Sequence, residues 1–259
     1  MARKDSFDIG RFGRFLSFEL KETVRENGLF ILLAGLVPLM LLIVTFLFSL
    51  TYNPEKIDEV WSGYAGLKAF VATVAIVLFL LIFPILKYGD ITDRRKGQMP
   101  LMLPSSHAEK ACSAFLVSVI IVPAVFMLLY FGTDALLCAV FPECGKSLAG
   151  YYARTGLIDS NYGSFNINCT FAFFLPPMVS LAGLAGGALF KKHKITKTFF
   201  SCSVAFILFM MTMVSIIDSS EISIEQIRNN FEWFWYTVQT VTAAGFGFYY
   251  WKRTASIEL

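Results

Sequence analysis

Long apolar stretches alternate with polar, charged segments along the whole chain. Six stretches contain no Asp, Glu, Lys or Arg, and each is close to the ~20 residues that a helix needs to cross a ~30 Å hydrocarbon core. The six stretches are residues 29–50, 69–86, 111–131, 169–190, 198–217 and 233–251. The pattern predicts an all-α integral membrane protein with six transmembrane helices.

The basic residues between these stretches predict an orientation. If both termini lie on the cytoplasmic side, 17 of the 22 Lys and Arg residues fall on that side, as the positive-inside rule requires. The remaining five are Lys56, Lys68, Lys146, Arg154 and Arg228. The chain then divides into a cytoplasmic arm (1–28), a transmembrane domain (29–251) and a cytoplasmic tail (252–259), with both ends inside.

Composition supports the same class of protein. The chain is 56% hydrophobic and only 16% charged, with a mean hydropathy of +0.62, which is too apolar for an ordinary soluble domain. The net charge is +3. The basic residues lie beside the span ends, where membrane topology and anionic lipid headgroups account for them. Membrane lipids are therefore expected partners, and nucleic acid is not.

The N-terminal arm has the pattern of an amphipathic helix over residues 7–26. Its apolar face holds Ile9, Phe12, Leu16, Leu20 and Val24, and its basic face holds Arg11, Arg14, Lys21 and Arg25. Such a helix lies in the membrane interface. Two interpretations stay open: an anchor that orients the first span, or an anchor that also packs against a cytoplasmic partner.

The loop from Lys87 to Lys110 carries start and stop signals for a short helix of its own. Asp90 can cap it, Gly97 can end it and Pro100 prevents its continuation. The two turns between these signals expose four charged side chains that a partner could grip, namely Asp93, Arg94, Arg95 and Lys96. A basic loop without a partner is the alternative.

The third span is expected to begin with its own cap. Ser106 and Glu109 follow Pro104 and have the spacing of a capping box, in which each side chain accepts a hydrogen bond from the other residue's backbone N–H. We therefore predict that the helix of the third span starts directly after Ser106, close to Lys110.

Glycines and prolines indicate where the spans meet protein. Pro38, Pro84, Pro123 and the pair Pro176-Pro177 remove backbone hydrogen bonds that lipid cannot replace, so these stretches should face protein or a cavity. Gly183 and Gly187 form a G-x-x-x-G pattern, with Gly186 offset by one. This face predicts close packing against another helix, either of this chain or of a second copy.

Reactive chemistry is sparse. No pair of the five cysteines has metal-ligand spacing, no ionisable residue lies in the middle of a span, and H-E-x-x-H is missing. Gly145-Lys146-Ser147 lacks the first glycine of a phosphate loop. We expect no catalytic, cofactor or metal site and no ATP binding by this chain. Cys144 and Cys169 either form a disulfide or remain free thiols.

The run Leu103-Pro104-Ser105-Ser106-His107-Ala108-Glu109-Lys110 is similar to the L-P-A-S-x-x-E-K signature of a bacterial subgroup of type-2 ABC exporter permeases, with Ser105 in place of the usual alanine. The layout of six spans, an interfacial N-terminal helix and a short loop helix also resembles that family over essentially the whole chain. The resemblance implies a multi-pass protein of the bacterial cytoplasmic (inner) membrane.

In that family the loop helix couples to a separate ATPase. The resemblance thus implies a coupling role for the helix from Asp90 to Lys96, with an ATP-binding cassette ATPase and a second permease copy, identical or different, as partners. The outer loop between spans five and six is brief compared with many members, which argues against a re-entrant gate helix. The substrate is not indicated.

The leading hypothesis is the membrane subunit of an ABC exporter, which would perform no covalent chemistry itself. The principal alternative is a non-transporting membrane sensor or scaffold whose loop recruits another cytoplasmic partner. A membrane enzyme is disfavoured for want of reactive groups.

Overall fold

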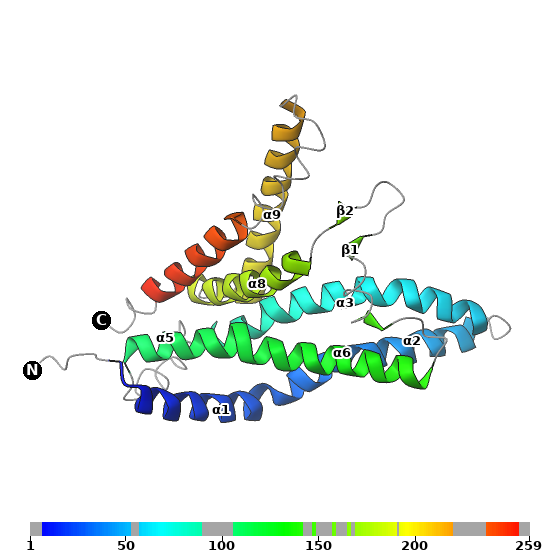
Figure 1. Cartoon of the computed structure of the whole chain (residues 1–259), viewed down its shortest axis with the longest axis horizontal. Coiled ribbons are helices and arrows are strands. Elements are labelled where there is room, and N and C mark those ends of the chain that lie inside the picture. Colours follow the sequence, from blue (N-terminus) through cyan, green and yellow to red (C-terminus); the bar gives the residue numbers. More distant parts are fainter. Residues whose placement is uncertain are drawn as a thin grey trace, which may run out of the picture. The chain divides into compact units, whose positions relative to one another are not determined.

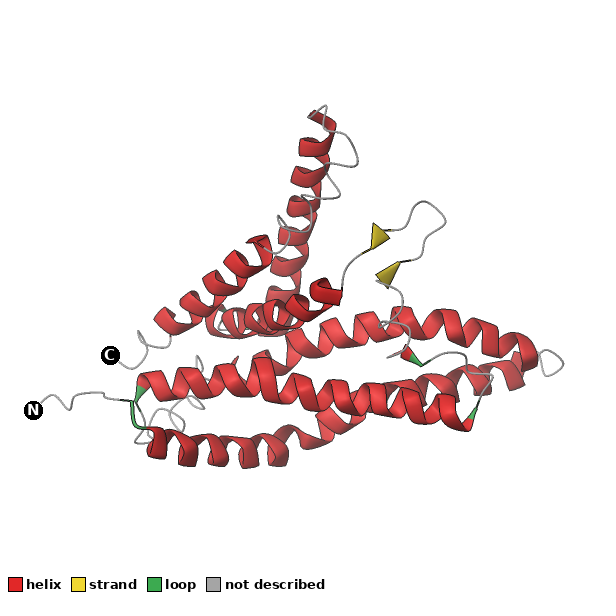
Figure 2. Cartoon of the chain, viewed as in Figure 1, coloured by secondary structure: helices red, strands yellow, loops and turns green. Residues whose placement is uncertain are grey.

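The computed structural model describes residues 7–52, 57–89, 106–141, 147–148, 157–158, 165–166, 169–190, 192–219 and 237–253. The described chain is helical apart from one pair of short antiparallel strands (Figures 1 and 2). Its elements are α1 (Ile9–Gly35), α2 (Val37–Tyr52), α3 (Ile57–Tyr88), α5 (His107–Phe115), the π-helix η3 (Leu116–Ile121), α6 (Val122–Val140), β1 (Leu157–Ile158), β2 (Phe165–Asn166), α8 (Cys169–Leu189), α9 (Lys194–Ser219) and a helix over 237–253.

Two helical segments within the described residues are long and apolar enough to cross a membrane, Leu67–Tyr88 and Ala108–Val140. A third is added if α1 and α2, which are bent by 47° at their junction, count as one broken span. The segment Pro176–Leu189 is apolar but shorter. The described part of the chain is thus helical and contains two to three helices that could span a membrane.

A helix covers all or most of each of the six predicted stretches, but the helix ends differ from the predicted span limits. The predicted boundary between arm and first span, at residue 28, lies inside α1, which continues to Gly35. The helical segment Ala108–Val140 has 33 residues, or about 50 Å at 1.5 Å per residue. Only part of it fits within a ~30 Å hydrocarbon core.

The residues form two compact units. The first contains Met1–Ser17, Leu80–Val119 and Phe174–Leu259, and the second contains Phe18–Phe79 and Ile120–Phe173. In the second unit α2 packs against α6 (Figure 1). Phe79 stacks on Phe126 with ring centroids 3.9 Å apart and on Phe30 at 5.6 Å, so aromatic rings from α1, α3 and α6 form one core.

The break between α1 and α2 lies at Leu36, two residues before Pro38. Proline cannot donate to the helical ladder and disrupts the turn before it. The Thr133 hydroxyl donates to the Gly35 carbonyl at 2.8 Å, and the Tyr64 hydroxyl donates to the Pro38 carbonyl at 3.3 Å. Side chains of α6 and α3 therefore satisfy backbone groups at the break, which confirms that this proline faces protein.

In the first unit, α3 and α8 pack through the glycines of α8. A Cβ added at Gly183 would lie 2.5 Å from the carbonyl oxygen of Leu81, and one at Gly187 would lie 3.3 Å from the Cα of Gly89. Leu81 and Ile85 form a buried cluster with Ala182. Pro84 lies in this contact, so the stretch it disrupts also faces protein.

Two local features were not predicted. The helix of the third stretch widens into the π-helix η3 over Leu116–Ile121, which ends two residues before Pro123. A proline ring clashes with the carbonyl four residues earlier, here Val119 in η3, and a π turn accommodates such a clash. The second unit also holds a two-residue antiparallel ladder that pairs Leu157 with Asn166 and Ile158 with Phe165 (Figure 2).

Candidate functional site

The candidate site consists of the two ends of the loop that joins α3 to α5, both in the first unit. The predicted loop-helix residues Asp90, Asp93, Arg94, Arg95 and Lys96 lie outside the described residues. What the structure describes is how the chain enters the loop at Gly89 and leaves it at Ser106. The entry is bonded to a side chain from a distant part of the sequence, and the exit is bonded to Glu109, which in turn binds a distant side chain.

The exit from the loop is the capping box that the sequence predicted. Ser106 has the extended backbone of an N-cap and begins α5, and its hydroxyl accepts from the backbone N–H of Glu109 at 3.3 Å. In return the Glu109 carboxylate accepts from the backbone N–H of Ser106 at 3.0 Å. The prediction that the third helix starts at Ser106 is confirmed. Lys110 belongs to this turn and donates its backbone N–H to the Ser106 carbonyl at 3.1 Å.

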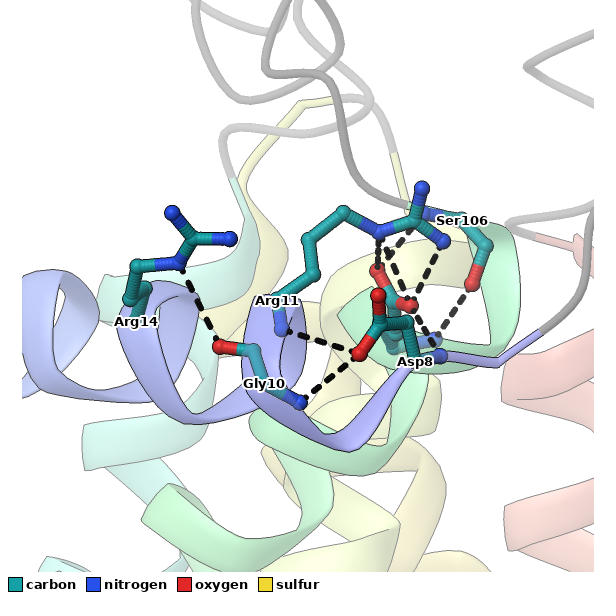
Figure 3. A network of polar contacts seen from close by, with 6 residues as sticks. Asp8, Gly10, Arg11, Arg14 and Ser106 are labelled. Carbon is teal, nitrogen blue, oxygen red and sulfur yellow. Dashed lines mark hydrogen bonds and ion pairs between the residues drawn. The ribbon is translucent and has the colours of Figure 1, made fainter.

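Glu109 also binds the start of α1, which the sequence did not indicate. The Arg11 guanidinium donates from Nε to Oε2 at 2.8 Å and from Nη2 to Oε1 at 2.7 Å. The backbone N–H of Asp8 donates to Oε1 at 2.9 Å (Figure 3). One carboxylate thus joins the first turns of α1 and α5. Its side chain is fully buried, whereas that of Arg11 is 35% exposed.

Asp8 fixes the geometry on the α1 side as an N-cap. Its carboxylate oxygen Oδ1 accepts from the backbone N–H of Gly10 at 2.8 Å (Figure 3). Its carbonyl accepts the first helical bond, from the Phe12 N–H, at 2.8 Å. An Asp directly before an amphipathic run is a recognised start signal, so this cap was visible in the sequence. The N–H of an N-cap residue makes no bond within the helix that it caps. The Asp8 N–H can therefore donate to Glu109.

The entry to the loop is held from α9. The Lys194 ammonium donates to the carbonyl of Gly89, the residue that follows α3. Lys194 begins α9 directly after His193, whose φ of 52° is left-handed, a conformation that non-glycine residues adopt rarely. This turn between α8 and α9 aims Lys194 back at α3. The loop entry at Gly89, which follows α3, is therefore bonded to α9. The loop exit at Ser106, which precedes α5, is connected through Glu109 to α1.

The three glycines proposed for helix packing all contact this chain. Gly183 and Gly187 meet α3, and a Cβ at Gly186 would lie 2.3 Å from the Thr198 side chain in α9. The alternative left open by the sequence is settled for this face, because helices of the same chain cover it. A second copy would have to bind through another surface.

The sequence also missed a buried ion pair in the second unit. Lys68 Nζ lies 3.7 Å from Asp134 Oδ1, and the two side chains are 7% and 0% exposed. Asp134 also accepts from the backbone N–H of Leu148, and Lys68 donates to Cys138 Sγ at 3.5 Å. Both residues fall within the helical segments that could span a membrane. Their hydrophobic neighbours in sequence gave no sign that they would pair.

No family model, curated protein or solved structure matches the chain in the comparisons. Among the residues that the structure describes, no group of three or more His, Cys, Asp and Glu side chains is placed to hold a metal ion. Cys112, Cys138 and Cys202 are not in disulfide bonds. Cys169 begins α8, but Cys144 lies outside the described residues, so the question of a Cys144–Cys169 disulfide stays open.

Proposed function

We propose that the chain is the permease subunit of an ABC exporter, with six transmembrane helices and both termini in the cytoplasm of a bacterial cell. A separate ATP-binding cassette ATPase would dock on the loop 90–105 and supply the energy. A second permease copy would complete the substrate path. Helices over all six apolar stretches and the asymmetry of basic residues support this assignment.

The observation that carries the proposal is the position of Glu109. It is a residue of the signature-like run 103–110, and its buried carboxylate ties the loop exit to both α5 and α1. A loop that ended in a free linker would absorb the movement of a docked partner. A loop whose exit is bonded to two helix starts, and whose entry at Gly89 is bonded to Lys194, passes that movement to α1, α3, α5 and α9.

A tagged chain purified in mild detergent from its native membrane provides the test. We expect an ATP-binding cassette ATPase to co-purify in a defined stoichiometry and the complex to hydrolyse ATP. Changing Arg94 and Arg95 together to Glu should remove both the ATPase and the activity, because exposed ion pairs contribute ~1 kcal/mol or less each and a single change is too small. Lys192→Glu, an exposed position outside the loop, is the matched charge control.

The two functional hypotheses predict different results. If the double Arg variant retains its ATPase and exports normally, the loop is not the coupling element. If the wild-type chain never carries an ATPase but retains another cytoplasmic protein through the same loop, the sensor or scaffold hypothesis replaces the exporter.

A further inference from the structure

A lysine, an aspartate and a cysteine meet in the second unit, where α3 contacts α6. Lys68 Nζ donates to Cys138 Sγ at 3.5 Å and lies 3.7 Å from Asp134 Oδ1. Asp134 and Cys138 are four residues apart on α6, so they lie on one face of that helix. Of the three described cysteines, Cys138 is the one whose sulfur accepts from a lysine.

The three side chains differ in their access to water. Those of Lys68 and Asp134 are 7% and 0% exposed. Cys138 is half-buried and lies in the last turn of α6, which ends at Val140. A small oxidant can therefore reach the sulfur near the end of the helix, while the lysine nitrogen beside the sulfur is sheltered from water.

The distance from nitrogen to sulfur suits a covalent step. Groups held with their reacting atoms about 3–3.5 Å apart react as a unimolecular pair, and the Lys68–Cys138 distance of 3.5 Å falls at the upper end of that range. A cysteine oxidised to a sulfenic acid condenses with a thiol or with a backbone nitrogen, and an uncharged lysine amine is a stronger nucleophile than a backbone amide. We propose that hydrogen peroxide converts Cys138 and Lys68 into a sulfenamide cross-link, which joins α6 to α3 covalently.

The reaction balances in two stages. In the first, the Cys138 sulfur attacks one peroxide oxygen: the O–O bond breaks, sulfur is oxidised to the sulfenic acid, and the other oxygen is reduced and leaves with the thiol proton as water. In the second, Lys68 gives a proton to Asp134, and its uncharged nitrogen attacks the sulfur. The S–N bond forms, the S–O bond breaks, and the departing hydroxide takes one of the two remaining nitrogen protons and leaves as water.

Asp134 makes the cross-linked state compatible with burial. Attack by Lys68 removes the ammonium group that compensates the buried Asp134 carboxylate, and an uncompensated buried charge is strongly destabilising. Because Asp134 takes up the lysine proton, both charges disappear together. The neutral acid can still accept from the Leu148 N–H through Oδ2, so the cross-link leaves no buried charge without a partner.

The proposal depends neither on an ATPase nor on transport, so it is tested separately from the proposed function. In the full-length chain in detergent, the other four cysteines are changed to Ala, which leaves Cys138 as the single thiol and prevents disulfides within the chain. After brief treatment with dilute hydrogen peroxide, non-reducing peptide mapping should recover the peptides of Lys68 and Cys138 as one linked species. This species should be two hydrogen atoms lighter than the two peptides together, and dithiothreitol should separate them again.

Lys68→Arg in the same single-cysteine chain is the matched control, because the guanidinium keeps a positive charge beside Asp134 but is a poor nucleophile. In this variant dimedone, which traps sulfenic acids, should label Cys138 several-fold more than in the chain that keeps Lys68. If the chain with Lys68 is labelled as strongly as the variant and yields no linked peptides, the lysine does not react and the proposal is overturned. A Cys138 peptide that stays unmodified in peroxide overturns it as well.

Discussion

Arg11 Nη2 lies 2.7 Å from Glu109 Oε1, although 98 residues separate the two positions along the chain. The pair is unequal, because the Glu109 side chain is fully buried and the Arg11 side chain is 35% exposed. Loss of Glu109 leaves a guanidinium that can still reach water. Loss of Arg11 leaves a carboxylate with no access to water and only backbone donors.

This asymmetry predicts unequal effects of the two substitutions on stability. Arg11→Leu should lower the stability of the protein by about 2–3 kcal/mol, because it leaves the buried Glu109 charge uncompensated. This loss is somewhat smaller than for a fully buried pair, since the Arg11 side chain is partly exposed. Glu109→Gln should cost about 1 kcal/mol, since the amide oxygen can still accept from the Ser106 N–H. Thermal denaturation of each variant in the same detergent measures the difference.

The double variant of these two positions completes a thermodynamic cycle. If the contact is formed as described, the combined loss is smaller than the sum of the single losses, because the buried charge has gone. Additive losses, or a larger loss for Glu109→Gln than for Arg11→Leu, would contradict the contact. Arg14→Leu, on the exposed face of α1, is the matched arginine control and should be nearly silent.

The capping box gives a second prediction. Ser106→Ala removes the acceptor for the Glu109 N–H and should destabilise the start of α5 by about 0.5–2 kcal/mol. Ser106→Thr keeps the hydroxyl and should be close to neutral. Amide hydrogen exchange over residues 107–112 should rise in the alanine variant and not in the threonine variant. Equal exchange in both would mean that the serine hydroxyl does not cap the helix.

Local spacing explains what the sequence could and could not reveal about this site. Ser106 and Glu109 are three residues apart, so the capping box is visible as a pattern. Arg11 reaches Glu109 only because two helix starts meet, and no periodicity in either segment encodes that meeting. The same holds for Lys68 and Asp134 on α3 and α6, which looked like separate residues at span ends.

In the fold, too, local sequence patterns predicted some features and missed those that depend on contacts between distant segments. Apolar length predicted where helices lie, because burial of a ~20-residue stretch requires a helix in lipid. It did not predict where helices bend or widen, since the break at Leu36 and the π turn before Pro123 depend on how each proline is accommodated by its neighbours. Nor could glycine spacing identify the partner of α8, which is decided by packing with α3 and α9.

The glycines of α8 give a graded prediction. Gly183→Ala should destabilise the protein by about 2 kcal/mol or more, because the new methyl group meets the Leu81 backbone at 2.5 Å, and overpacking that must shift a helix costs 1–3 kcal/mol. Gly187→Ala meets Gly89 at 3.3 Å and should cost less. Gly132→Ala, with no atom within 4 Å, should be neutral or stabilising. Equal melting temperatures for all three would contradict the α3–α8 contact.

The pair Lys68 and Asp134 predicts a rescue experiment. Lys68→Met leaves the fully buried Asp134 carboxylate without its counter-charge and should cost about 3–5 kcal/mol. Adding Asp134→Asn removes that charge while its amide oxygen can still accept from the Leu148 N–H, so the double variant should recover most of the loss. Thermal unfolding measures both. A double variant that is less stable than Lys68→Met alone would show that the two charges do not interact.

The last prediction concerns the six-span topology, which the 17 to 5 division of basic residues motivates. A membrane-impermeant maleimide applied to intact cells after mild reduction should label a chain whose single cysteine is Cys144. It should not label one whose single cysteine is introduced at Lys192 until the membrane is opened. Lys192 is the suitable position because it is exposed, whereas Lys194 binds Gly89 and His193 has a left-handed backbone. Labelling of position 192 in sealed cells would reverse the orientation and place the loop 90–105 outside, where no ATPase could reach it.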